Sequence, residues 1–135
     1  MPARKKPVRK RVTRKKRPAG AGFRAGEAAL RRYALSFPEA YEEFPWGERV
    51  IKVNKKIFVF LHGSAGELRV TTKLPRSYGA ALLAPFCKPT GYGLGKSGWV
   101  TSSFKKGDQP PFDILKGWID ESYRAVAPKR LITKL

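Results

Sequence analysis

The chain has 135 residues, enough for one domain and too few for two of typical size. Its 29 Lys and Arg residues against 10 Asp and Glu give a formal net charge of +19, which indicates a polyanionic partner such as DNA or RNA. The single cysteine excludes an internal disulfide and no apolar run is long enough to cross a membrane, so we expect a cytoplasmic protein, associated with the nucleoid if it is bacterial.

Residues 1–22 are predicted to form a disordered polybasic arm that binds phosphates. They contain no acid and the following ten cations: Arg4, Lys5, Lys6, Arg9, Lys10, Arg11, Arg14, Lys15, Lys16 and Arg17. The arm has too few aliphatic side chains to offset an ordering cost of roughly 1–2 kcal/mol per residue. Closely spaced cations suit phosphate binding, because each neutralised phosphate releases condensed counterions. The alternatives are a solubilising tail or a nuclear localisation signal, whereas membrane insertion is disfavoured because the arm has no amphipathic face.

Residues 23–135 are predicted to form one domain that begins with a helix. Apolar residues from Leu30 to Phe37 recur at helical spacing. Residues 36–39 have the spacing of a capping box, which predicts a second short helical turn to about Glu43. The sequence Pro45-Trp46-Gly47 ends that turn. The acids around it are expected either to face solvent or to pair with the excess cations; they are Glu39, Glu42, Glu43 and Glu48.

Three strands are predicted next. Segments 49–53 and 56–61 are rich in Val, Ile and Phe, and the intervening Asn54-Lys55 favours a tight hairpin because Asn tolerates positive φ. Residues 62–66 are expected to form a loop. Residues 67–73 then alternate between apolar and polar, which is typical of a strand with one face in water.

The remaining pattern predicts two helices separated by one or two strands. A helix is expected after Pro75 and ends before Pro85, and the glycine-rich segment 89–98 is expected to be a loop or an irregular strand. Residues 99–104 read as a strand followed by a turn at 105–108. The last helix follows Pro110-Pro111, and its buried face is Leu115, Trp118, Ile119, Ser122 and Val126. The element order α-β-β-β-α-β-β-α predicts an α+β fold with an antiparallel sheet.

Five lysines of the folded domain fall in or next to predicted turns. They are Lys55, Lys56, Lys96, Lys105 and Lys106. If these turns share one end of the sheet, the lysines form a phosphate-binding patch beside the arm. Tyr92 and Trp99 are nearby candidates for stacking on bases. The simpler interpretation is that loops are usually charged and that a Trp at the start of a strand usually belongs to the core.

The sequence offers little support for catalysis, a metal or a cofactor. Gly95-Lys96-Ser97 does not fit a phosphate-binding loop, because Gly91 is one position too close and a strand follows instead of a helix. His62 lies in a predicted exposed loop, and Cys87 is expected to be a small buried side chain. One His and one Cys do not make a transition-metal site. We therefore expect a protein that is not an enzyme.

Three segments resemble the MmcQ/YjbR family. They are Phe44-Pro45-Trp46-Gly47 with the strands after it, Gly91 to Trp99, and Ile119-Asp120-Glu121-Ser122-Tyr123. The resemblance covers about residues 24–131 and implies a domain similar to the secretion-chaperone-like fold, in a family usually labelled DNA-binding. Many members carry Asn-Lys-Lys-His-Trp where this chain has Gly95 to Trp99, so any role of that His is absent. The arm lies outside the resemblance.

Together, charge and resemblance predict a nucleic-acid-binding protein, with DNA favoured over RNA, that binds electrostatically and with little sequence preference. An alternative is a chaperone-like adaptor whose sheet face or helix groove binds an acidic protein. A third possibility, an enzyme acting on a small molecule, requires a concave pocket with converging polar groups.

Overall fold

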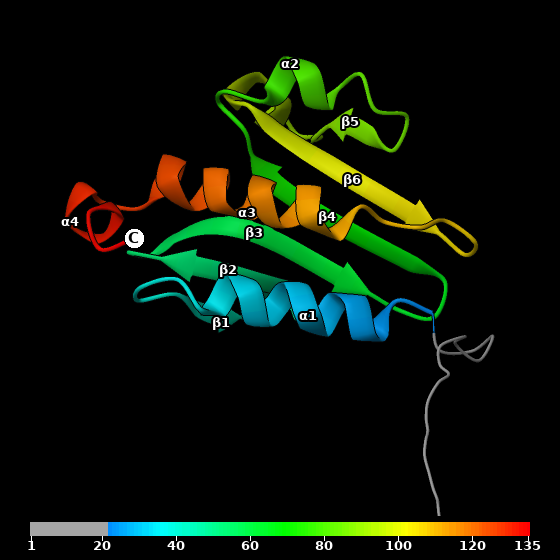
Figure 1. The fold of residues 1–135 in the computed structure, drawn as a ribbon, viewed down its shortest axis with the longest axis horizontal. Coiled ribbons are helices and arrows are strands. Elements are labelled where there is room, and N and C mark those ends of the chain that lie inside the picture. Colours follow the sequence, from blue (N-terminus) through cyan, green and yellow to red (C-terminus); the bar gives the residue numbers. More distant parts are fainter. Residues whose placement is uncertain (1–21) are drawn as a thin grey trace, which may run out of the picture.

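The computed structural model describes residues 22–135, which form a six-stranded antiparallel sheet with helices packed on it (Figure 1). The strands are β1 (Tyr41–Glu43), β2 (Arg49–Val53), β3 (Lys56–Gly63), β4 (Glu67–Lys73), β5 (Cys87–Pro89) and β6 (Trp99–Lys105), in the spatial order β1-β2-β3-β4-β6-β5. The helices are α1 (Arg24–Leu35), α2 (Tyr78–Ala81), α3 (Phe112–Val126) and α4 (Lys129–Ile132), with the 3₁₀ turns η2 (Pro45–Gly47) and η3 (Leu94–Ser97). The predicted α+β class with an antiparallel sheet is confirmed. The predicted arm lies outside the described residues, apart from Gly22.

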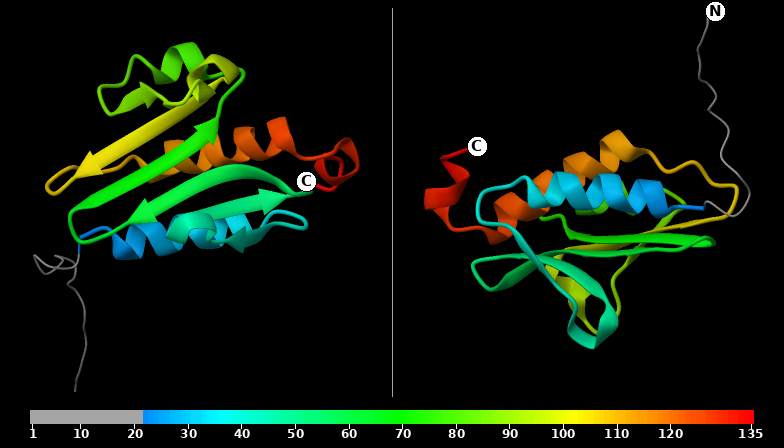
Figure 2. Two further views of the ribbon diagram at one scale, coloured as in Figure 1. Left: turned by 180° about the vertical axis from the view of Figure 1, so that it is seen from behind. Right: turned by 90° about the horizontal axis from the view of Figure 1, so that it is seen from below.

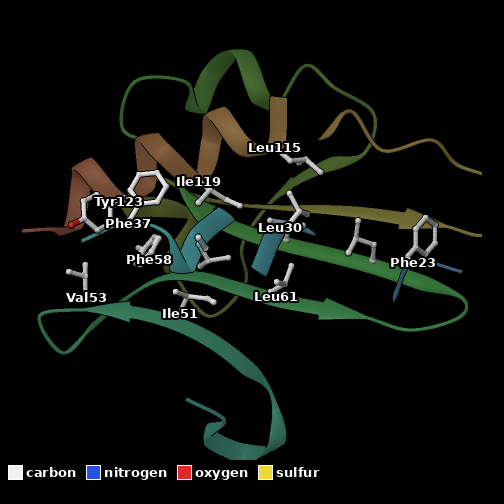
Figure 3. Packing of buried hydrophobic residues seen from close by; sticks show 14 of the residues in the cluster. Phe23, Leu30, Phe37, Ile51, Val53, Phe58, Leu61, Leu115, Ile119 and Tyr123 are labelled. Atoms are coloured by element: carbon white, nitrogen blue, oxygen red, sulfur yellow. The ribbon is translucent and has the colours of Figure 1, made fainter. Parts of the chain in front are cut away.

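The two long helices, α1 and α3, lie side by side on one face of the sheet (Figures 1 and 2). Between these helices and the sheet lies the main core, drawn in Figure 3. Leu30 of α1 and Ile119 of α3 are fully buried there against Phe58 and Leu61 of β3. The opposite side of the sheet, away from α1 and α3, is called the open face below.

Tyr123 contributes both ring packing and a hydrogen bond to this core. Its ring is fully buried and lies edge-on to Phe58, with ring centroids 5.2 Å apart. Its hydroxyl donates a hydrogen bond to the carbonyl of Pro38 at 2.8 Å, which gives the phenolic group the partner that a buried Tyr requires. Burial raises the pKa of Tyr123 above its ordinary value. The C-terminal part of α3 is thereby tied to the segment that joins α1 to β1.

A β-bulge in β3 gives Ser122 its role. Ile51 pairs with Val59 and Lys52 with Ile57, so Phe58 is the extra residue of the bulge. The hydroxyl of Ser122 donates to the Phe58 carbonyl at 2.6 Å and accepts from the backbone N–H of Lys73 at 2.8 Å. The predicted buried position of Ser122 is therefore confirmed, and its hydroxyl satisfies backbone groups of two strands.

The hairpin predicted at Asn54-Lys55 is confirmed. Both turn residues have positive φ, 51° at Asn54 and 67° at Lys55, as a two-residue type I′ turn requires. β2 and β3 pair up to Val53 and Lys56 on either side of it.

The helical turn predicted to run to about Glu43 is wrong, because Tyr41–Glu43 is strand β1, paired with β2. The Ser36 hydroxyl does not cap a new helix but bonds back to the Tyr33 carbonyl at 2.6 Å, and Glu39 takes a positive φ of 59° that ends helical geometry. The edge strand is then held by ion pairs to residues distant in sequence, which local spacing does not reveal.

Three smaller boundaries also differ from prediction. β3 continues through His62 and Gly63, so the predicted loop reduces to the turn at 64–66. The helix expected after Pro75 is only the four-residue α2, which begins at Tyr78. The side chain of Glu121 on α3 holds the turn that precedes it. Its carboxylate accepts hydrogen bonds from the backbone N–H of Arg76 at 2.8 Å, and from the N–H and hydroxyl of Ser77 at 2.9 and 2.6 Å. The short α4 after Pro128 was not predicted.

Among the described residues, no helix is long and apolar enough to cross a membrane.

Candidate nucleic-acid interface

The antiparallel strands place the predicted lysines at two opposite ends of the sheet. Asn54 turns the chain at one end, where Lys73 also pairs with Trp99 at the start of β6. At the other end Lys105 pairs with Glu67, and the N–H of Phe23 donates to the Ser64 carbonyl at 3.0 Å. We call these the Asn54 end and the Phe23 end.

The lysine patch therefore does not form at one end as the conditional prediction required. Lys55, Lys56 and Lys96 lie at the Asn54 end, whereas Lys105 and Lys106 lie at the Phe23 end. All five are exposed, and within residues 22–135 none of them takes part in an ion pair. The arm joins the domain at the Phe23 end, so it is Lys105 and Lys106 that lie next to its attachment.

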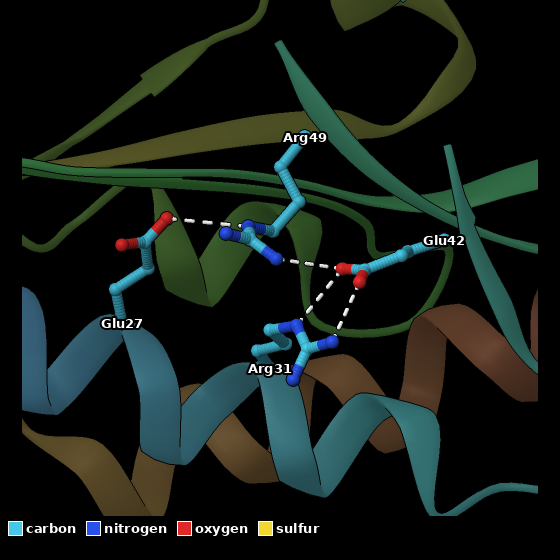
Figure 4. Close-up of polar contacts among 4 residues, drawn as sticks. All are labelled: Glu27, Arg31, Glu42 and Arg49. Carbon is cyan, nitrogen blue, oxygen red and sulfur yellow. Dashed lines mark hydrogen bonds and ion pairs between the residues drawn. The ribbon is translucent and has the colours of Figure 1, made fainter. Parts of the chain in front are cut away.

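Much of the acidic charge is neutralised in ion pairs around α1, β1 and β2 (Figure 4). Glu42 accepts two hydrogen bonds from Arg31, at 2.6 and 2.9 Å, and one from Arg49 at 2.6 Å. Arg49 also reaches Glu27 at 3.3 Å. The bonds from Arg31, assisted by Arg49 and opposed by burial, hold the pKa of Glu42 below its ordinary value. The expected pairing of this acidic segment with cations is confirmed at Glu42.

Three further pairs follow the same rule. Lys52 binds Glu43 at 3.0 Å, Arg130 binds Glu39 at 3.1 Å, and Arg69 binds Glu67 at 3.1 Å. Pairs this exposed contribute little to stability, because water screens the two charges. Their consequence is electrostatic: the acids are matched to cations, while other lysines keep an uncompensated charge. Since the arm holds ten of the net +19 charges, the described residues carry +9.

Several of those lysines lie on the open face, beside a row of hydroxyl groups. Alternation along the strands points Lys73 of β4, Lys88 of β5 and Lys105 of β6 to this face. The hydroxyl of Thr101 lies 3.0 Å from both the Thr71 and the Thr90 hydroxyls. Thr71 is buried, whereas Thr90 and Thr101 are half-buried. Lysines and accessible hydroxyls are common donors to phosphate oxygens, so the lysines with Thr90 and Thr101 suit the backbone of a nucleic acid.

The two aromatic residues singled out from sequence lie in different surroundings. Trp99 is half-buried on the open face and meets Phe60 edge-to-face, with centroids 5.6 Å apart. Tyr92 is fully exposed in the turn between β5 and η3. Sequence analysis missed a third, Trp46, which is 89% exposed in η2. A Trp between Pro and Gly was the available signal, because neither neighbour favours a helix or a strand interior.

A cavity of about 380 Å³ opens beside Trp46 at the Phe23 end. It lies where β3 extends beyond its pairing with β2, and its lining includes Phe44, Trp46, Glu48, His62 and Arg69. His62 was predicted in an exposed loop; it is instead a half-buried strand residue on the wall of this cavity.

Burial and close packing explain two further residues that were considered from the sequence, Cys87 and Gly95. Burial raises the pKa of the Cys87 thiol, against the effect of its hydrogen bond with Ser102, so the reactive thiolate is disfavoured. Gly95 is buried, and a Cβ at this position would lie 2.8 Å from the Cβ of Pro89, so close packing explains this glycine. Within residues 22–135, no group of three or more His, Cys, Asp or Glu side chains is placed to hold a metal ion.

Comparison with models of known protein families gives a match. The YjbR family model matches residues 35–125, from the end of α1 to near the end of α3. No curated protein sequence matches the chain. The matched range contains the open face and the lining of the cavity apart from Glu27, and it leaves out the arm.

Proposed function

The chain belongs to the YjbR family, and we propose that it is a nucleic-acid-binding protein, without enzymatic activity, that holds DNA mainly through its phosphates. The observation that carries the proposal is the division of charge in the folded domain. Acids around α1 and β1 are matched to Arg and Lys side chains, whereas Lys73, Lys88 and Lys105 on the open face lack an ion pair among the described residues.

The arm and the open face have different tasks in this proposal. The ten cations of the arm supply most of the affinity, because they can follow a phosphate backbone without a fixed geometry. The open face supplies cations and hydroxyls at fixed positions on a rigid sheet. Neither arrangement reads base edges in a groove, so binding depends weakly on sequence.

The proposal predicts a steep salt dependence that the arm controls. With six to eight arm cations engaged, the logarithm of the binding constant falls with the logarithm of salt concentration with a slope of about −5 to −7. Fluorescence anisotropy on a labelled duplex measures the slope for the full chain and for a chain that lacks residues 1–19. A chain of full length with the ten arm cations changed to Gln is the matched control for length. Equal affinity and slope in all three proteins contradict the role of the arm.

A second candidate function is an adaptor that binds an acidic protein. The specific observation in its favour is exposed apolar surface at Phe44 and Trp46, which are 54% and 89% exposed. A protein complex held by such surface survives high salt, whereas a phosphate complex does not. Binding that persists at about 1 M salt, where the Debye length is only about 3 Å, favours the adaptor.

A further inference from the structure

Trp46 is exposed in a backbone conformation that a Trp does not favour. Its φ is 58°, in the left-handed region that costs roughly 1–2 kcal/mol for a residue other than Gly. Gly47 beside it also has positive φ, at 79°. Phe44, which begins the turn, is held by the guanidinium of Arg49 at 5.0 Å from its ring centre. The turn is therefore fixed at its first residue, Phe44, and exposes the large aromatic ring of Trp46 to solvent.

The wall of the cavity beside Trp46 carries both hydrogen-bond donors and hydrogen-bond acceptors. Arg69 and His62 can donate hydrogen bonds into it, and the carboxylates of Glu27 and Glu48 can accept them. A site for phosphate alone would not place two carboxylates in its lining. A nucleobase carries donors and acceptors on its edge and an apolar face for stacking, and about 380 Å³ lies in the size range of small-ligand pockets.

The position of the cavity, next to positively charged residues, also suits the negative charge of a nucleic acid. The cavity opens at the Phe23 end, where the arm joins the domain and where Lys105 and Lys106 lie exposed. In the right-hand view of Figure 2 the connection between β1 and β2 projects below the sheet, on the side away from α1 and α3. A strand whose phosphates are held by the arm and these lysines therefore passes close to Trp46.

We propose that the cavity receives one unpaired base of a single-stranded nucleic acid, stacked on Trp46. The inference rests on the proposed function and narrows it from nucleic acid in general to strands with accessible base faces. In a duplex the faces are already stacked and cannot reach an aromatic ring on the protein surface, whereas single strands offer them freely.

The test compares the affinity of full-length variants for oligo(dT) and for a duplex of equal length. Trp46→Ala is expected to weaken oligo(dT) binding by about 5- to 140-fold, the loss that corresponds to one base–aromatic stack, and to change duplex binding by less than about twofold. Trp46→Phe keeps most of the affinity because it keeps an aromatic face. Tyr92→Ala is the matched control, because Tyr92 is also exposed with positive φ but lies in the turn after β5, outside the cavity and at the opposite end of the sheet. This proposal gives the stacking role to Trp46 and not to Tyr92, the candidate from the sequence, so removal of the Tyr92 ring leaves both affinities unchanged.

Parallel measurements with oligo(U) tell whether the base comes from DNA or RNA, and selective loss on either single strand supports the proposal. Equal loss on single strand and duplex, no loss on any single strand, or an equal loss from Tyr92→Ala overturns it. A different result would show that the proposed nucleic-acid-binding function itself is wrong. In that case the unmodified chain binds neither single strand nor duplex, or binds them with no dependence on salt.

Discussion

At the scale of single residues, the hydroxyl of Ser122 serves two strands at once. It lies fully buried in α3 between the Phe58 carbonyl and the Lys73 N–H. The helical spacing of the sequence correctly placed Ser122 on the buried face. It could not reveal the partners, because the bulge that turns the Phe58 carbonyl toward α3 arises from strand register, which single-residue patterns do not encode.

Ser122→Ala is expected to lower the free energy of unfolding by about 2–4 kcal/mol, because it leaves two buried backbone groups without a partner. Urea denaturation measures the change. Ser103→Ala is the control: Ser103 is half-buried on β6 and faces the open side, so we expect a change within about 0.5 kcal/mol. Similar losses in the two variants show that the Ser122 bonds do not stabilise the fold.

Trp46 illustrates the same limit at the candidate site. The sequence Pro45-Trp46-Gly47 was interpreted as the end of a helical turn, whereas it follows strand β1 and forms the turn η2. The exposure of Trp46 and its position beside the cavity depend on β3 extending beyond the last residue that pairs with β2. This extension is a property of the folded sheet.

At the scale of elements, the hairpin and β1 show opposite outcomes. The Asn54-Lys55 turn was predictable because its signal is local: two residues between two strand-forming runs. β1 was not predictable, because Glu42 is held by Arg31 of α1 and Arg49 of β2, contacts that join separate parts of the chain.

Lys55→Gly is expected to raise the free energy of unfolding by about 0.5–1 kcal/mol, because Lys55 has a φ of 67° and Gly adopts this region without strain. Lys56→Gly also removes one positive charge, but from the first position of β3. It is expected to lower the free energy of unfolding by about as much as Lys55→Gly raises it. Thermal unfolding of both variants measures the difference. If both variants lose stability equally, the turn is not strained at Lys55.

At the scale of the whole molecule, ion pairs and caps make the fold sensitive to acid. The pKa of Glu42 is lowered chiefly by Arg31. Burial pushes the pKa of Glu121 upward, but the hydrogen bonds from Ser77 and Arg76 outweigh it and lower the net value. A lowered pKa means that the folded state binds protons less readily than the unfolded chain, so it is stabilised above the unfolded pKa, about 4.3 for Glu.

Stability is therefore expected to fall as the pH drops from about 6 through the unfolded Glu value and to keep falling until the folded pKa values are passed. Glu42→Gln removes the contribution of Glu42 to this pH dependence. At pH 7 this variant is expected to be less stable than the unmodified chain by about 1 kcal/mol, and the gap closes at low pH, where both carry an uncharged side chain. Unfolding midpoints across this range give the result, and a gap that is constant with pH contradicts the linkage.

The distribution of the lysines over the sheet also belongs to this scale. The sequence located each lysine in or beside a turn, but only the strand order shows that Lys96 and Lys105 lie at opposite ends. A single patch at one end is thus replaced by cations spread along the open face.

The two edges of the sheet carry a consequence for assembly. β1 and β5 are each three residues long, β1 contains Glu42 and Glu43, and β5 ends at Pro89, which has no N–H to donate. Short, charged or proline-bearing edges resist pairing with the strand of another molecule. Copies that crowd onto one polyanion are therefore expected to sit as separate units, spaced by mutual repulsion of their cations, instead of joining their sheets into a continuous ribbon.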